Sequence, residues 1–252
     1  MRTIAIINLK GGTGKTTTTV NLAAELQHRG KRVLCIDADP QHNLTDFYGA
    51  DTEDTTITDL LAGRVGSAGL LVQRIGSGLG VVPSDLSLCE IDIEAVRRGI
   101  SLRMVRDLCE DVAGQFDVCL IDCPPSFTAA SIAALVAADE VILPVTVDAF
   151  AVGGAQEIVR QVDNLATVNP ALRVLGLLVT MWTRTSVCIQ GEEAVRRLDL
   201  PVLTSRIRRS CKVQEATFAR QPLRQYAPHC PAAQDYDDLA CEILGEWGQC
   251  DG

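Results

Sequence analysis

Short apolar runs and helical patterns alternate along most of this chain. Continuous apolar runs are typical of strands that are buried on both faces of a parallel sheet, and they cover residues 3–8, 32–37, 118–122, 141–145 and 174–179. Apolar positions at helical spacing lie between them, in residues 20–26, 129–137, 155–168 and 188–198. Strands that alternate with helices are joined by right-handed crossovers. The pattern therefore predicts an α/β fold: a mostly parallel, twisted sheet with helices on both faces.

The remaining segments are less regular. Residues 49–115 suggest only short elements, at 58–61, 79–82 and 102–108. Residues 232–248 have apolar positions at helical spacing and acids on the other faces, which predicts a C-terminal helix that packs on the fold. A chain of 252 residues with 47% hydrophobic content suits one large core. We therefore expect residues 1–252 to form a single domain.

Composition narrows the class of protein. No stretch approaches the length of a membrane span, and the sequence starts with a strand pattern rather than a signal sequence, so we expect a cytoplasmic protein. The ten cysteines include no C-x-x-C pair and mostly occupy apolar positions, which favours buried thiols over disulfides or a metal site. The net charge of −9 argues against a strongly basic nucleic-acid protein, although an average can conceal a local patch.

A glycine-rich turn joins the first strand to the first helix. Gly11, Gly12 and Gly14 allow the backbone to curl so that its N–H groups face an anion, and a helix N-terminus adds to anion binding. The sequence Gly14-Lys15-Thr16 matches the end of the phosphate-loop motif G-x-x-x-x-G-K-S/T, while Leu9 stands where the first glycine would be. In such loops the lysine reaches the β and γ phosphates and the hydroxyl ligates Mg²⁺. A chance glycine-rich turn is the alternative, but the required strand and helix context is present.

Three acids follow predicted strands. Asp37 and Asp39 end the second strand, and Asp122 ends the strand at 118–122. In open α/β sheets ligands bind beyond the carboxyl ends of the strands, and an acid at that position can hold Mg²⁺ through water. Helix capping or a solvated turn is the alternative for each aspartate.

A second lysine, Lys10, precedes the doubled glycine. Its spacing from Lys15 resembles the "deviant" Walker A motif x-K-G-G-x-G-K-T of the ParA, MinD and nitrogenase iron protein group of ATPases. Residues 37–41, 121–126, 178–181, and 227–228 with 236–240 also look like segments of ParA partition ATPases, so the resemblance spans nearly the whole chain. A lysine in a solvated loop is the alternative for Lys10.

The resemblance implies ATP and Mg²⁺ as ligands and assigns roles to the motif residues. Lys10 would contact the phosphates of the partner subunit's nucleotide, and Lys15 those of its own. Thr16 would ligate Mg²⁺, Asp122 would hold a water of the metal, Asp37 would support the metal site and Asp39 would position the attacking water. The remaining loop contacts would come from Gly11, Gly12, Thr13, Gly14 and Thr17, the last at the α phosphate. Many relatives read I-P-R-N where this chain has residues 207–210 as I-R-R-S, so adenine contacts are not carried over.

A basic segment, residues 203–226, is the candidate DNA surface. It contains one acid, Glu215, and six cations: Arg206, Arg208, Arg209, Lys212, Arg220 and Arg224. Such cations can bind DNA phosphates without reading bases, although a solvated surface is the alternative. The resemblance implies an ATP-bridged homodimer that binds DNA non-specifically and lies on the nucleoid in its ATP state. It also implies slow hydrolysis that a ParB-like partner stimulates, in plasmid or chromosome partition.

Other functions on the same scaffold remain open. A ParA-like ATPase can instead position a protein cargo, and the sequence hardly separates that role from DNA partition. A MinD-like role is disfavoured because the acidic C-terminal helix would be repelled by anionic lipid, so no membrane partner is expected. Metal-cluster assembly is disfavoured by the lack of a cysteine pair motif.

Overall fold

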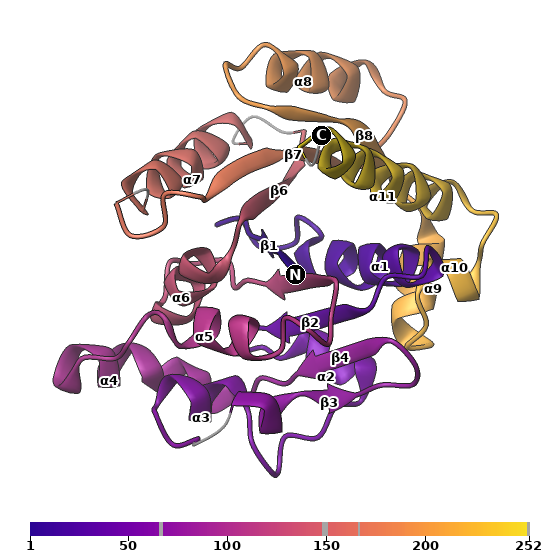
Figure 1. Ribbon diagram of the computed structural model, residues 1–252. Helices are drawn as coiled ribbons and strands as arrows, with labels where there is room; N and C mark the ends of the chain where they lie inside the picture. Colours follow the sequence, from indigo (N-terminus) through magenta and orange to yellow (C-terminus); the bar gives the residue numbers. More distant parts are fainter. Residues whose placement is uncertain (66–67, 148–150, 166, 251–252) are drawn as a thin grey trace.

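An eight-stranded sheet runs through the molecule (Figure 1). The computed structural model describes residues 1–65, 68–147, 151–165 and 167–250. The strand order is β3-β4-β2-β5-β1-β6-β7-β8, and every neighbouring pair is parallel except β3 and β4. The strands are β1 Arg2–Ile6, β2 Val33–Asp37, β3 Gln73–Arg74, β4 Leu79–Val82, β5 Val118–Asp122, β6 Glu140–Thr146, β7 Arg173–Trp182 and β8 Val202–Arg208. The predicted α/β fold with a mostly parallel sheet is confirmed.

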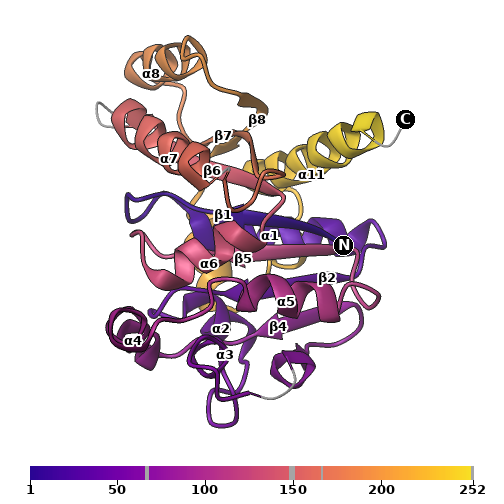
Figure 2. The same ribbon diagram turned by 60° about the vertical axis from the view of Figure 1, so that its left-hand side comes forward.

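Helices cover both faces of this sheet. They are α1 Lys15–His28, α2 Asn43–Tyr48, α3 Ile57–Leu61, α4 Ile91–Arg98, α5 Met104–Asp111, α6 Ala129–Ala137, α7 Ala151–Leu165, α8 Ser186–Arg196, α9 Cys211–Phe218, α10 Leu223–Tyr226 and α11 Pro231–Cys250, with 3-10 turns η1 Ala68–Leu71 and η2 Leu86–Glu90. Helices α5, α6 and α7 pack on one face and α1, α9 and α11 on the other (Figure 1). Figure 2 shows α4 and α8 on the opposite side of the molecule from the start of β1.

The continuous apolar runs of the strands are explained by burial on both faces. In β5, Cys119 and Ile121 belong to the core beneath α5 and α6, whereas Val118 and Leu120 belong to the core beneath α1 and α11. Successive side chains of a strand point to opposite faces, so each face needs its own set of apolar residues. The same division holds in β1, where Ala5 packs on the first side and Ile4 on the second.

The edge strand β8 differs from the strands that the apolar pattern predicts. Within Val202–Arg208, Leu203 and Ile207 are buried, while Thr204 and Arg206 are exposed. An edge strand packs fewer of its side chains, so it carries no continuous apolar run, and the sequence shows this stretch only as the start of the basic segment. By contrast, α6 and β4 occupy the residues that the apolar pattern predicts.

The composition predicts buried thiols and no membrane span, and the structure bears on both predictions. Of the nine cysteines whose side chains are described, five are buried, namely Cys35, Cys109, Cys119, Cys123 and Cys188, and all nine are free thiols. Within the described residues, no helix combines the length and the apolar character that crossing a membrane requires.

Gly80 in β4 fills a position where the core leaves no room for a side chain. A Cβ atom there would lie 2.5 Å from Cζ of Phe116 and 2.8 Å from Cγ1 of Val72. Overpacking of a core usually costs about 1–3 kcal/mol, so we expect Gly80→Ala to lower the free energy of unfolding by about that amount in urea titrations. Gly114→Ala is the control, because a Cβ there would meet no atom within 4 Å. An equal loss in both variants would contradict the steric explanation.

Candidate active site

The glycine-rich loop leaves the carboxyl end of β1 and enters α1. Gly12 and Gly14 have φ angles of +72° and +90°, a region that side chains rarely adopt, so these two positions require glycine. A Cβ atom added at Gly11, Gly12 or Gly14 would meet no other atom within 4 Å. Open space in front of a curled backbone at a helix N-terminus fits a bound phosphate group.

Two buried polar side chains fix this loop to the neighbouring strands. The Asn8 amide donates to the carbonyl oxygen of Pro144 at 2.6 Å, and its Oδ1 accepts from the backbone N–H of Lys10 at 2.9 Å. The Thr180 hydroxyl donates to the carbonyl oxygen of Thr13 at 2.8 Å. The sequence motifs assign no role to Asn8 or Thr180. A polar residue within or at the end of an apolar strand is the signal that could have identified both.

The two lysines of the motif lie in different surroundings. Lys15 is buried, and its Nζ donates to the carbonyl oxygen of Lys10 at 3.4 Å. Burial lowers the pKa of Lys15, while the nearby carboxylates Asp122 and Asp39 raise it. Lys10 is exposed, and its Nζ donates to the hydroxyl of Thr146, at the end of β6, at 3.4 Å. One lysine therefore faces the interior of the site and the other faces outward from the carboxyl edge of the sheet.

The strand-end acids come together beside the loop. Asp37 and Asp122 are paired neighbours at the ends of β2 and β5. The Thr16 hydroxyl donates to Oδ2 of Asp122 at 2.6 Å. Burial, followed by the charge of Asp37, raises the pKa of Asp122 well above its usual value. Two buried carboxyl groups with a hydroxyl beside them favour a bound cation, because a cation would offset the cost of keeping them ionised.

Asp37 is already engaged by its own chain. Its Oδ2 accepts from the backbone N–H and the hydroxyl of Thr45 at 2.9 and 2.8 Å, and its Oδ1 accepts from the N–H of Asp39 at 3.1 Å. Burial raises the pKa of Asp37 to about 6, and the hydrogen bonds from Thr45 oppose the rise. These contacts tie the start of α2 and the Asp39 turn to the end of β2.

Asp39 is buried at the end of that turn. Its Oδ1 accepts from the backbone N–H of Gln41 at 2.9 Å, and no hydrogen bond to Oδ2 is present within the described residues. Asp39 is also close enough to Lys15 to raise the pKa of that lysine. The carboxylate is thus held by one oxygen next to the phosphate loop.

A cavity of about 360 Å³ adjoins the loop at Gly14 and Thr17. Its other walls come from β7, from the end of β8 and its connection to α9, from α9 and from α11; they are Thr180, Met181, Ile207, Arg208, Arg209, Ser210, Cys211, Val213, Gln214 and Tyr236. Met181 has a φ of +52°, which is rare for a residue with a long side chain. A cavity that begins at the phosphate loop and has apolar and polar walls suits the nucleoside part of a nucleotide.

The basic segment does not form one continuous patch of free cations. Four of its six cations pair with acids. Arg206 pairs with Glu192 at 2.9 Å, Arg208 with Asp235 at 2.7 Å, Lys212 with Glu215 at 2.7 Å and Arg224 with Glu25 at 2.7 Å. Glu25, Glu192 and Asp235 lie outside residues 203–226, so counting charges within the segment could not reveal them. Arg209 and Arg220 are exposed and make no ion pair within the described residues.

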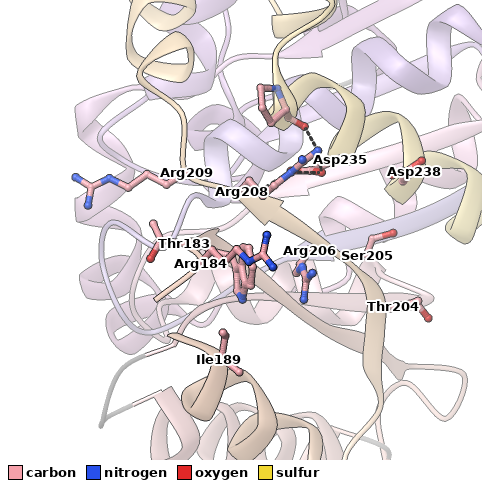
Figure 3. Close-up of a pocket in the computed structure, with 12 residues that line it drawn as sticks. Thr183, Arg184, Ile189, Thr204, Ser205, Arg206, Arg208, Arg209, Asp235 and Asp238 are labelled. Atoms are coloured by element: carbon pink, nitrogen blue, oxygen red, sulfur yellow. Dashed lines mark hydrogen bonds and ion pairs between the residues drawn. The ribbon is translucent and has the colours of Figure 1, made fainter. Parts of the chain in front are cut away.

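An open groove of about 1200 Å³ collects several of these cations (Figure 3). The Arg206 guanidinium lies 4.0 Å from the centre of the Trp182 ring. Figure 3 shows Arg209 extended away from the ion pair between Arg208 and Asp235. Arg184, which follows β7, lines the same groove although it lies outside the basic segment. Local charge density in the sequence does not mark Arg184, because the fold brings this residue to the groove.

Known proteins resemble this chain over most of its length. A family model described as an AAA domain matches residues 1–174. The chromosome partitioning protein ParA of Caulobacter vibrioides is 35% identical over 97% of this chain and 94% of its own, and the sporulation initiation inhibitor protein Soj of Bacillus subtilis is 36% identical over 95% and 97%. Among solved structures, cobyrinic acid a,c-diamide synthase of Mycobacterium smegmatis with a bound ATP analog and magnesium superposes with a TM-score of 0.85 and 29% identity, covering 98% of this chain and 96% of its own.

Proposed function

This chain belongs to the family of ParA and Soj partition ATPases, and from that premise we propose the cycle that it performs. It binds ATP and Mg²⁺, dimerises around two nucleotides, binds DNA without sequence preference in that state, and separates after hydrolysis. With a ParB-like partner this cycle drives the partition of plasmid or chromosomal DNA. The observation that carries the proposal is the phosphate loop with one buried lysine, one outward-facing lysine and carboxylates at the adjoining strand ends.

Nucleotide binding rests on groups that are already in place. The backbone of residues 11–17 cradles the phosphates, and Lys15 reaches them from the buried side of the loop. Thr16 and Asp122, whose Oγ1 and Oδ2 atoms lie 2.6 Å apart, would hold Mg²⁺, and Asp37 would fix the surrounding turn. Mg²⁺ would supply neutralisation of the phosphate charge when bound there. The nucleoside occupies the cavity beside Gly14 and Thr17.

Dimerisation follows from the position of Lys10. The outward-facing ammonium group of Lys10 lies at the carboxyl edge of the sheet, where a second copy would bring its own nucleotide. Phosphates that approach one another across an interface repel, and a cation from each side offsets that repulsion where water is excluded. Loss of the γ phosphate removes the group that Lys10 favours, so nucleotide state controls assembly.

DNA binding uses cations near this edge in the ATP-bound dimer. Arg209 and Arg220 extend from the basic segment without ion pairs among the described residues, and Arg184 joins Arg206 and Arg209 around the groove of Figure 3. Dimerisation doubles the number of phosphate contacts, which explains how a protein with a net charge of −9 binds DNA only with ATP. This binding places the ATP form on the nucleoid.

The proposal is tested by filter binding of an arbitrary DNA duplex with ATP, with ADP and without nucleotide. We expect retention only with ATP, and a steep fall in retention as the salt concentration rises, because phosphate contacts release counterions. The double variant Arg184→Ala and Arg209→Ala should lose about tenfold or more in affinity at constant salt and show a smaller salt dependence. Arg160→Ala is the control, since that arginine lies on α7 and pairs with Glu157. Equal retention in all three nucleotide states would contradict the proposed function.

A further inference from the structure

The segment formed by η2 and α4 has apolar side chains on two sides. Leu88 and Ile91 are 4% and 1% exposed and belong to the core beneath α5 and α6. A second set of apolar side chains is exposed to solvent, namely Leu86, Cys89, Ile93 and Val96. The exposed fractions of Leu86, Ile93 and Val96 are 64%, 60% and 88%. A surface helix of a globular protein normally has one apolar face and one polar face, so the second set requires an explanation.

These four exposed residues form one stripe along the segment. They are separated by three, four and three residues, and the backbone is helical from Leu86 to Arg98, first as a 3-10 turn and then as an α-helix. Positions three apart in a 3-10 turn, and three or four apart in an α-helix, lie on the same side. Alternating steps of three and four are also the spacing of the apolar seam between two packed helices. The exposed stripe therefore fits another helix.

The exposed stripe lies at the carboxyl edge of the sheet. Figure 1 shows α4 projecting at the lower left of the molecule. The Asp92 carboxylate fixes α4 there, because it accepts from the backbone N–H of Ala129, at the start of α6, at 2.6 Å. Helix α6 follows the end of β5, where Asp122 lies. The proposed function brings a second copy to this same edge, at which Lys10 is exposed.

Charges beside the exposed stripe favour the same segment of a second copy as its occupant. Glu90 and Arg97 are exposed, and neither makes an ion pair within the described residues. Each directly follows a residue of the stripe, so both charges flank it on one side. Two such segments that pack antiparallel place Glu90 of each beside Arg97 of the other. Parallel packing would instead place like charges level with each other.

We propose that the exposed stripe docks antiparallel on the same stripe of a second copy and forms a second contact of the dimer, in addition to Lys10. This inference rests on the proposed function, which supplies the dimer. A two-fold axis makes the two halves of such a contact identical. The buried apolar side chains contribute affinity, and the two charge pairs at the rim fix the orientation. Because this contact does not touch the nucleotide, a substitution in it should weaken the dimer without changing ATP binding by the single chain.

The inference is tested by reversing the charges beside the exposed stripe. The dissociation constant of the dimer is measured by sedimentation equilibrium with a non-hydrolysable ATP analogue and Mg²⁺. Glu90→Arg and Arg97→Glu should each weaken the dimer about tenfold or more, because like charges then meet across the axis. The double variant, Glu90→Arg with Arg97→Glu, exchanges the two charges and should return the affinity to within about threefold of the wild-type value. Val96→Ser should weaken the dimer as well, because it removes an apolar contact.

Asp111→Arg is the matched control for the charge reversals. Asp111 is exposed at the end of α5, which precedes β5 and therefore lies at the opposite edge of the sheet. This control should dimerise like the wild type. Single reversals that leave the dimer at its wild-type affinity overturn the inference alone, with a helix of another protein as the remaining occupant, and so does a double variant as weak as the single ones. A wild type that stays monomeric with the analogue overturns the proposed function together with this inference.

Discussion

Lys10→Ala is expected to abolish the ATP-dependent dimer while leaving ATP binding by the single chain measurable. In the proposed site, Lys15 and the backbone of residues 11–17 bind the phosphates from within one chain, whereas Lys10 is exposed. Two triphosphates that face each other repel strongly in a region from which water is excluded. Without the cations that offset this repulsion, the dimer should weaken by about a hundredfold or more, because an unpaired buried charge costs several kcal/mol.

Light scattering with ATP and Mg²⁺ measures this loss directly. Lys31→Ala is the matched control, because it removes the same charge from the turn that precedes β2, at the opposite edge of the sheet. The control should dimerise like the wild type. An ATP dimer of undiminished mass and affinity in Lys10→Ala would show that Lys10 is only a solvated loop cation. A failure to bind ATP would instead place Lys10 in its own chain's phosphate site.

The parts of the site that the sequence predicted are those that one segment determines. Gly12 and Gly14 are required by the backbone of the loop, and the acids Asp37 and Asp122 follow from where two apolar runs stop. The parallel sheet then brings these ends together, because the carboxyl ends of β1, β2 and β5 share one edge. A local motif and a known topology are therefore enough to assemble this half of the site.

The remaining parts depend on contacts between distant segments. Arg224 pairs with Glu25 and Arg208 with Asp235, so the charge that the basic segment shows to solvent is smaller than its sequence suggests. Thr180 supports the phosphate loop from β7, far along the chain from Thr13. A polar residue within an apolar strand marks Thr180 in the sequence, but no local pattern identifies the partner in any of these three contacts. Their assignment required the fold.

Asp39→Ala is expected to suppress ATP hydrolysis by about a hundredfold or more while the ATP dimer persists. Asp39 is buried beside the phosphate loop and is held by one oxygen, Oδ1, to the N–H of Gln41. The proposed role of its carboxylate is to orient the attacking water, and a positioned acid or base contributes typically about 10²–10⁴-fold in rate. Lys10, Lys15 and Thr16 are untouched by the substitution, so nucleotide binding and dimerisation should continue. Phosphate release and light scattering, measured on the same sample, separate the two properties.

Two further variants distinguish a chemical role of Asp39 from a structural one. Asp39→Asn keeps the shape of the side chain and an acceptor for the Gln41 N–H but loses the charge, so it should hydrolyse ATP as slowly as Asp39→Ala if the carboxylate orients water. If the hydrogen bond to Gln41 alone mattered, Asp39→Asn would regain the wild-type rate. Asp46→Ala is the control, because Asp46 is an exposed aspartate on the adjoining helix α2. Because hydrolysis is the proposed step that separates the dimer, Asp39→Ala should also keep DNA bound after a chase with excess ADP, while the wild type releases it.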